Sequence, residues 1–349
     1  MKEFWSGRIR DAVPYVPGEQ PRDRKFIKLN TNENPYPPSE RAAEAMRAAV
    51  NADLRLYPDP ECTALRAAAA ECWGVKPEQV FCGNGSDEIL AFCFQAFFDP
   101  GREVVFPRIT YSFYPVYTDY FGLDRREVPM NPDFSDPVEL LCGNNGGVVL
   151  ANPNAPTGIA VELDVVEKLL QANPNVVVIV DEAYVDFGAQ SAVGLINRYP
   201  NLVVVQTLSK SRSLAGLRVG FALAQENLIA ALCCVRDSIN SYTVDRVAQA
   251  GAAAALADRE YFEQTRKKVM GTRAWTIREL EKLGFTVCPS QANFVFARHP
   301  DRPGKEIFDY LRQEGILVRR WDIPEIRDWL RISIGTDEEM QALISALKG

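Results

Sequence analysis

The sequence predicts an α/β protein in which a mostly parallel sheet flanked by helices is followed by a smaller C-terminal α+β domain. Short, unbroken apolar runs rich in β-branched residues recur between helical stretches, at residues 103–106, 147–150, 176–180 and 202–205. Runs of this kind are typical of strands buried on both faces of a parallel sheet, with crossover helices on both sides. Beyond about residue 245 the pattern changes to long helical segments and short strands, which indicates the second domain.

The elements of the first part follow in order along the chain. Residues 1–28 contain several prolines and mixed charge, and we expect them to form an extended arm. Caps and apolar spacing predict three helices, at residues 39–50, 61–73 and 86–98, with Ser39 and Ser86 capping the first and third. Apolar runs ending near Val80 and at residues 219–222 add two strands. We expect the large domain to span residues 29–244.

The remaining residues, 245–349, are expected to form the smaller domain. Apolar spacing predicts two long helices, at residues 244–257 and 259–283. Short strands are expected around Val287, at residues 294–297 and at residues 330–334.

Composition and charge argue against several classes of function. The chain of 349 residues has a net charge of −7, which disfavours nucleic acid as a partner because phosphate backbones are bound by clustered Lys and Arg. The eight cysteines show no CxxC pair and no metal-ligand spacing, so we expect reduced thiols and no metal site. The one histidine, His299, argues against His-based triads and His metal clusters. We find no signal-peptide core and no apolar run of about 18 residues, so we expect a cytoplasmic protein without a membrane partner.

The most informative segment is TLSKSRSLAGLR, residues 207–218, which lies between two expected strands. Ser209 and Arg218 can hold a phosphate, while Lys210 faces the group that this phosphate carries. A lysine amine in such a place can act as a nucleophile and form a Schiff base. A surface loop with ordinary basic residues is the alternative, but the position between two buried strands favours a site.

The turn at residues 82–88, CGNGSDE, predicts a second contact to the same phosphate. Glycines allow close backbone approach, and the free N–H groups at the start of the following helix attract anions. A turn followed by a helix cap would explain the motif equally well. It lacks the third glycine of a dinucleotide fingerprint, which argues against a nicotinamide cofactor.

The expected strand at residues 176–180 ends in Asp181-Glu182-Ala183-Tyr184. A carboxylate at this point can hold a pyridine nitrogen protonated, and Tyr184 can bond a neighbouring ring oxygen. An aspartate bound by backbone N–H groups, or a Mg²⁺ ligand, are the alternatives. The metal is disfavoured because no GxxxxGK[ST] motif accompanies it.

Two further strand ends carry residues suited to a ligand. The loop at residues 152–158, NPNAPTG, places asparagines on a turn shaped by proline and glycine. Tyr111 follows the strand at residues 103–106 and can stack on a flat ring. Each feature alone is also typical of ordinary loops.

Taken together and in this order, these segments resemble the fold-type I pyridoxal-phosphate aminotransferases, and among them the histidinol-phosphate branch. The similarity covers nearly the whole chain. The lysine segment is typical of the broad family, whereas the motifs LNTNENP at residues 29–35 and LRISIGT at residues 330–336 point to the branch. Matching motifs also lie at residues 56–58, 85–88, 152–158, 181–184 and 315–319.

The resemblance implies pyridoxal 5'-phosphate as the cofactor, attached to Lys210, with Asp181 at its ring nitrogen. Further cofactor contacts are implied for Ser86, Asp87, Ser209 and Arg218 around the phosphate, Tyr111 on the ring, Tyr184 and Asn154 at the phenolic oxygen, and Tyr57 reaching the phosphate from a neighbouring subunit. Many relatives have Asn at the position of Ala155, so here either Asn154 or Asn152 is left for the phenolic oxygen. For the substrate, the resemblance implies Arg331 as the anion ligand, assisted by Arg319, Tyr15 and Asn32.

The implied activity is transamination of histidinol phosphate with 2-oxoglutarate or glutamate, in the histidine pathway, by a homodimer. Lys210, Asp181 and Tyr184 would be its catalytic residues. Threonine-phosphate decarboxylation and transamination of aromatic amino acids are the alternatives on the same fold. A pyridoxal-phosphate-binding transcription regulator is disfavoured, because the segment ahead of residue 29 carries no basic helix-turn-helix pattern.

Overall fold

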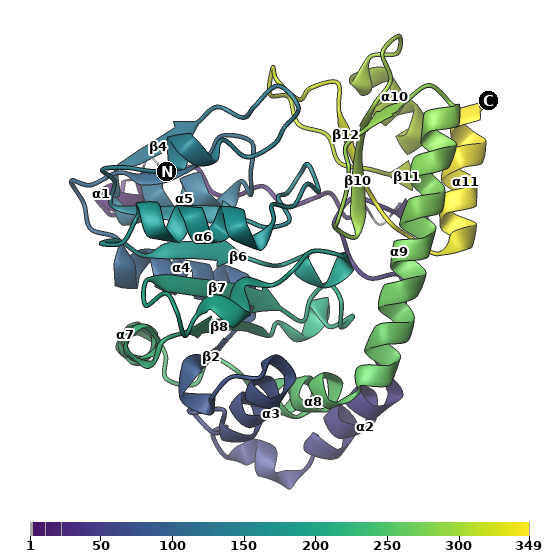
Figure 1. Ribbon diagram of the computed structural model, residues 1–349. Coiled ribbons are helices and arrows are strands. Elements are labelled where there is room, and N and C mark those ends of the chain that lie inside the picture. The colour runs from purple at the N-terminus through teal and green to yellow at the C-terminus, as the bar shows by residue number, and fades with distance from the viewer. Residues whose placement is uncertain (1–2, 11, 22, 349) are drawn as a thin grey trace.

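The computed structural model describes residues 3–10, 12–21 and 23–348, and within them the chain forms two packed parts joined by a long helix (Figure 1). Residues 1, 2, 11 and 22 of the expected arm, and residue 349 of the expected small domain, lie outside the described residues.

The larger part is built on a sheet that has seven strands within the described residues. In spatial order these are β2 (Val80–Gly83), β8 (Gly220–Ala224), β7 (Leu202–Thr207), β6 (Val178–Asp181), β5 (Gly147–Ala151), β3 (Val104–Pro107) and β4 (Arg125–Val128). Strands β7, β6, β5, β3 and β4 run parallel, and β8 is antiparallel to both of its neighbours. The predicted mostly parallel sheet is therefore confirmed.

Alternate residues of each central strand enter different cores, which explains the unbroken apolar runs. Val148 and Leu150 of β5 pack on one side with α3 (Thr63–Trp73), α6 (Leu163–Ala172) and α8 (Arg246–Ala257). Val149 packs on the other side with α4 (Gly85–Phe97), α5 (Phe113–Phe121) and α7 (Glu226–Ile239). A strand covered on both faces needs apolar residues at every position.

The predicted helices of the first part lie close to their expected places, apart from one cap. Helix α2 (Glu40–Ala49) begins after Ser39, whose hydroxyl accepts from the Ala42 N–H. Helix α4 is preceded by Asn84 rather than by the expected Ser86, which falls in its first turn. Gly85 begins α4 with a φ of +82°, a conformation that glycine adopts without steric cost. The shift leaves Ser86 within the anion-binding turn.

The smaller part has an antiparallel sheet of β12 (Leu330–Ser333), β10 (Phe294–Arg298) and β9 (Thr286–Val287). It is covered by α10 (Gly304–Gln313), α11 (Asp337–Lys348) and the upper end of α9 (Arg259–Lys282), which runs down to α8 in Figure 1. Short 3-10 helices lie at Ala52–Arg55, Pro77–Gln79, Val138–Leu141, Val185–Phe187, Ala192–Leu195 and Ala215–Leu217.

Two segments pack differently from the expected division at residues 28 and 244. Strand β1 (Ile27–Lys28) pairs in parallel with β11 (Ile316–Leu317), so the end of the expected arm joins the smaller part. Helix α8 packs against α2 and α3 of the larger part, although its residues were expected in the smaller domain. Both segments pack against partners distant in sequence, which local patterns do not identify.

Candidate active site

A cavity of about 300 Å³ lies at the carboxyl ends of β5, β6 and β7, where Ala151, Asp181 and Thr207 line it. This is the edge at which open α/β sheets bind ligands. It brings together most residues that the sequence analysis selected: Tyr15, Asn32, Ser86, Asp87, Tyr111, Asp181, Tyr184, Ser209, Lys210, Arg218, Arg319 and Arg331. Within the described lining, Asn154 and Tyr57 are absent.

Lys210 stands in the cavity just after β7. Its Nζ donates to the Thr31 carbonyl oxygen at 3.3 Å and lies 5.6 Å from the centre of the Tyr184 ring. The Asn34 side-chain amide donates to the Lys210 carbonyl oxygen at 3.0 Å and so fixes its backbone. The backbone of Lys210 is thus held in place, while its side chain lines the cavity.

One end of the cavity, which we call the anion cup, is suited to an anion. The first turn of α4 with Ser86 lies beside Ser209 and Arg218, and free helix N–H groups attract anions. A Cβ on Gly85 would come within 2.5 Å of Arg218 Nη2. A Cβ on Gly220 would come within 2.7 Å of the Ser86 nitrogen. The two glycines therefore allow β8, α4 and the arginine to approach closely around this cup.

Asp87 connects this cup to an aromatic wall. One carboxylate oxygen accepts from the Tyr111 hydroxyl at 2.8 Å, and the other accepts from Arg218 at 3.1 Å. Burial raises the pKa of Tyr111 well above its ordinary value, so the phenol stays protonated as a donor. Asp87 orients both residues, and its charge is balanced by Arg218.

Asp181, the last residue of β6, is buried at the floor of the cavity. Its Oδ2 accepts from the Tyr114 hydroxyl at 2.8 Å, and its Oδ1 accepts from the Ala183 N–H at 3.2 Å. Burial raises the pKa of Asp181 to about 6, against the lowering effect of these donors. A positive group in the cavity would hold this carboxyl ionised. The sequence analysis missed Tyr114, which lies three residues after Tyr111, in the first turn of α5.

Tyr184 and Asn32 form another part of the cavity wall. The Asn32 side-chain amide donates to the Tyr184 hydroxyl oxygen at 3.0 Å, while the Ser333 hydroxyl donates to Asn32 Oδ1 at 2.9 Å. Because the Tyr184 oxygen accepts from Asn32, its own proton is available to an acceptor in the cavity. Asn32 has a φ of +57°, a left-handed conformation that Asn tolerates better than most residues.

The structure contradicts the expected role of Asn154. Its amide nitrogen donates to the Ile109 carbonyl oxygen at 2.9 Å, and its Oδ1 accepts from the Thr110 hydroxyl at 2.8 Å. Asn152 is likewise bonded to the Val161 backbone through both ends of its amide. Both side chains therefore brace the loop, and Ala155 lines the cavity in their place.

Two arginines from the smaller part close the cavity. Arg331 donates to the Asn30 carbonyl oxygen at 2.9 Å, while its buried Nε has no hydrogen-bond partner among the described residues. Burial lowers the pKa of Arg331, although a guanidinium remains charged at any working pH. An unpaired buried donor is costly, so Arg331 is suited to a ligand that carries an anion.

The second arginine, Arg319, joins the smaller part to the arm. It donates to the carbonyl oxygens of Val16 at 3.0 Å and Pro17 at 3.3 Å. A Cβ on Gly18 would lie 2.7 Å from the Thr31 side chain, so the arm packs tightly here. Four residues of the arm, Tyr15, Pro17, Gly18 and Gln20, contribute to the wall of the cavity.

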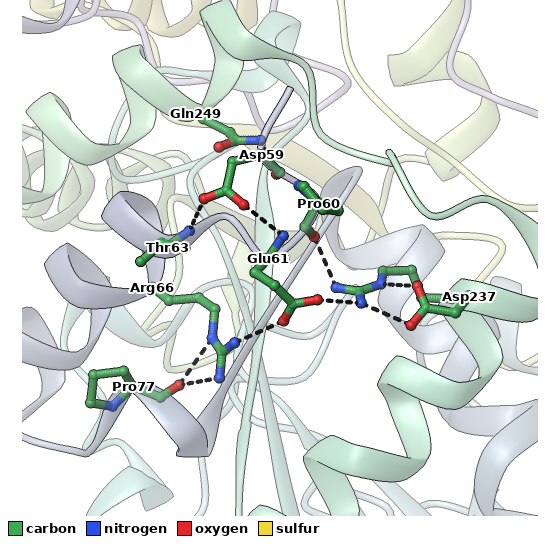
Figure 2. A network of polar contacts seen from close by, with 9 residues as sticks. Asp59, Pro60, Glu61, Thr63, Arg66, Pro77, Asp237 and Gln249 are labelled. Carbon is green, nitrogen blue, oxygen red and sulfur yellow. Dashed lines mark hydrogen bonds and ion pairs between the residues drawn. The ribbon is translucent and has the colours of Figure 1, made fainter. Parts of the chain in front are cut away.

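Tyr57 lies apart from this cavity, with 77% of its surface exposed. Its ring stacks on Tyr242 with centroids 4.6 Å apart. Just beyond it, the Asp59 carboxylate accepts from the Thr63 N–H and Glu61 binds Arg66, in the polar network that Figure 2 shows. Arg236 binds Glu61 and Asp237, each at 2.8 Å. An exposed aromatic ring on a braced segment is suited to a contact outside this chain.

The described residues lack two other features, a metal-binding cluster and a membrane-spanning helix. Among them, no group of three or more His, Cys, Asp and Glu side chains is placed to hold a metal ion. No helix within these same ranges is both long and apolar enough to cross a membrane.

The geometry of the cavity agrees with the protein family that the sequence matches. Residues 24–347 match the family model of aminotransferase class I and II. Histidinol-phosphate aminotransferases of Clostridium beijerinckii (53% identical, covering 100% of this chain and 97% of that protein) and Acinetobacter baumannii strain SDF (54%, covering 99% and 96%) are full-length relatives. The crystal structure of histidinol-phosphate aminotransferase from Sinorhizobium meliloti in complex with pyridoxal-5'-phosphate superposes with a TM-score of 0.86 at 28% identity, covering 93% of this chain and 90% of that one. The chain belongs to the class I and II aminotransferases, in the branch of the histidinol-phosphate aminotransferases.

Proposed function

We propose that this enzyme transfers the amino group of histidinol phosphate to 2-oxoglutarate at the cavity around Lys210. The observation that carries the proposal is the arrangement of four charged features around one space. The Lys210 amine, the anion cup near Arg218, the buried carboxylate of Asp181 and the Arg331 guanidinium all line this cavity. The chain is a pyridoxal-phosphate-dependent transaminase, as its family membership requires.

The residues of the cavity fit pyridoxal 5'-phosphate. When bound, this cofactor supplies a protonated ring that accepts the electron pair released at the substrate α-carbon. Ser86, Ser209 and Arg218 would hold its phosphate, and Gly85 and Gly220 leave room for this close approach. Asp181 would hold the proton on the ring nitrogen.

The aromatic residues would fix the ring between them. The Tyr111 hydroxyl donates to Asp87, which orients the Tyr111 ring, and this ring would lie against the face of the cofactor ring. The Tyr184 hydroxyl, oriented by Asn32, would donate to the phenolic oxygen. Since Ala155 lines this side of the cavity, Tyr184 carries this contact without an asparagine at that position.

Lys210 would hold the cofactor covalently in the resting enzyme and would release it to the substrate amine, which leaves the Lys210 amine free. Its freed Nζ would then remove the proton from the substrate α-carbon and return it to the cofactor side. Arg331 would bind the anion next to this carbon, which is a phosphate ester in histidinol phosphate and a carboxylate in glutamate. Arg319 and Tyr15 would complete this end of the cavity.

We further infer a homodimer in which Tyr57 reaches the cofactor phosphate of the partner subunit. The exposure of Tyr57 and the network that braces its segment support this inference. A cytoplasmic location remains a prediction.

Activity assays with three substrates test the proposal. We expect glutamate to form from 2-oxoglutarate with histidinol phosphate, at a kcat/KM at least about a hundredfold above that with phenylalanine, because the dianion makes stronger charge-assisted bonds. Threonine phosphate should release no carbon dioxide. Lys210→Ala should abolish all turnover and serves as the background control. Faster turnover of phenylalanine, or decarboxylation of threonine phosphate, would replace the proposal with one of the two alternatives.

A further inference from the structure

Tyr114 lies behind the cavity, on α5, and is completely buried. Its hydroxyl donates to Oδ2 of Asp181 at 2.8 Å. Its ring packs edge-on against Phe106 and Tyr111, with centroids 5.8 and 5.7 Å away. Among the described lining residues of the cavity Tyr114 is absent, so it acts on a ligand only through Asp181.

The Tyr114 hydroxyl is not needed for the packing of the aromatic cluster. A phenylalanine would fill the same aromatic cluster without bringing a polar group into the core, and a buried hydroxyl without a partner is destabilising. The bond to Asp181 is therefore what a tyrosine adds at this position. Since burial raises the pKa of Tyr114 well above its ordinary value, the phenol remains a donor throughout the working pH range.

Several groups around Asp181 act on its charge in opposite directions. Its burial and the nearby charge of Asp87 favour the neutral acid, whereas Tyr114, the Ala183 N–H and Lys210 favour the carboxylate. Two other titratable groups, Cys93 and Tyr117, face it from α4 and α5. Burial keeps both of these neutral by raising the pKa of each. Tyr114 is thus the one side chain among the described residues that donates a hydrogen bond to Asp181.

We propose that Tyr114 is a positioning residue that keeps Asp181 ionised and turns its remaining lone pairs toward the cavity. With Oδ2 held from behind and Oδ1 held by the backbone, the carboxylate cannot rotate away from a ring nitrogen in front of it. This inference rests on the role proposed above for Asp181.

The test is the pH dependence of Tyr114→Phe in the holoenzyme. Loss of one charge-assisted hydrogen bond should move the acidic limb of kcat to higher pH by on the order of one unit. At neutral pH kcat should fall about tenfold, because the ring nitrogen is less fully protonated, while KM should change less than about twofold. The absorption spectrum of the bound cofactor should titrate with the same shift.

Two comparisons separate this role from a structural one. Tyr117→Phe removes another hydroxyl of a buried tyrosine one turn further on, which donates to the Asp87 backbone, and should leave the pH profile in place. In an Asp181→Asn background, Tyr114→Phe should have no further effect on the profile, because the group through which it acts has gone. An unchanged profile in Tyr114→Phe, or an equal effect in both backgrounds, overturns the inference.

The spectral titration also separates this inference from the proposed function, because it requires bound cofactor and no substrate. A shifted spectral titration without turnover of histidinol phosphate would contradict the proposed substrate and support the role of Tyr114. Turnover of histidinol phosphate with an unshifted spectral titration would support the proposed substrate and contradict the role of Tyr114.

Discussion

Replacing Arg331 by alanine tests the anion site in the cavity. The guanidinium has five N–H donors; one binds the Asn30 carbonyl oxygen, and Nε has no partner among the described residues. Two charge-assisted bonds to a substrate anion, at about 1.5–3 kcal/mol each, would contribute about 3–6 kcal/mol. At roughly 1.4 kcal/mol per factor of ten, kcat/KM should fall by about two to four orders of magnitude.

The loss should appear in both half-reactions. Histidinol phosphate and 2-oxoglutarate present their anions next to the same reacting carbon, so single-turnover rates measured with each should fall together. Cofactor affinity should be nearly unchanged, because the anion cup at Ser86 and Arg218 lies at another part of the cavity. Arg320→Ala is the matched control: its guanidinium binds the Arg327 carbonyl oxygen and Asp322, outside the described lining.

Two results would refute this reasoning. A fall in kcat/KM of less than about fivefold would mean that the unpaired Nε does not meet the substrate. A matching loss of cofactor affinity would place Arg331 in the structure of the whole cavity rather than at the substrate anion.

Three further predictions concern other parts of the site. For Asp181, burial raises the pKa to about 6 from about 3.9 in an unfolded chain, so the folded cofactor-free protein binds the extra proton and its free energy of unfolding falls as pH rises through this window. Denaturant titrations should show that Asp181→Asn removes up to roughly 3 kcal/mol of this fall between pH 4 and 7, and identical slopes in both proteins would count against it. Arg319→Ala should lower kcat/KM for histidinol phosphate by about two to three orders of magnitude, with a smaller loss for phenylalanine. The same substitution should speed proteolysis of the arm, because the bonds to Val16 and Pro17 are lost. Equal losses for both substrates would show that Arg319 does not select the phosphate. Mixing Tyr57→Ala subunits with Lys210→Ala subunits should restore activity, since each mixed dimer carries one intact composite site, and no recovery on mixing would contradict the shared site.

The main features of the fold follow from local physical chemistry, which is why the sequence predicts them. Strands β5, β6 and β7 are covered on both faces, so their positions are apolar except at the carboxyl ends of β6 and β7, and the runs are easily recognised. Ser39 caps its helix as expected because capping involves residues only three apart. The lysine segment and the glycine turn were recognisable because an anion cup needs particular residues at fixed spacing.

Other features depend on contacts between residues distant in sequence. The edge strand β4 was missed because its sequence, Arg-Arg-Glu-Val, lacks an apolar run, and only pairing with β3 makes it a strand. Helix α8 has an ordinary apolar face, which does not specify that its partners are α2 and α3.

The residues of the site show the same difference between features set by local sequence and features set by long-range contacts. The sequence by itself determined that Lys210 and Asp181 meet at one edge of the sheet, because each follows a strand and the ends of parallel strands converge there. Only the tertiary structure decided that Asn154 turns inward to bind Ile109, that Tyr114 reaches Asp181, and that the arm lies on its own cavity. Side-chain direction and long-range contact are set by packing, and residue type constrains them only weakly.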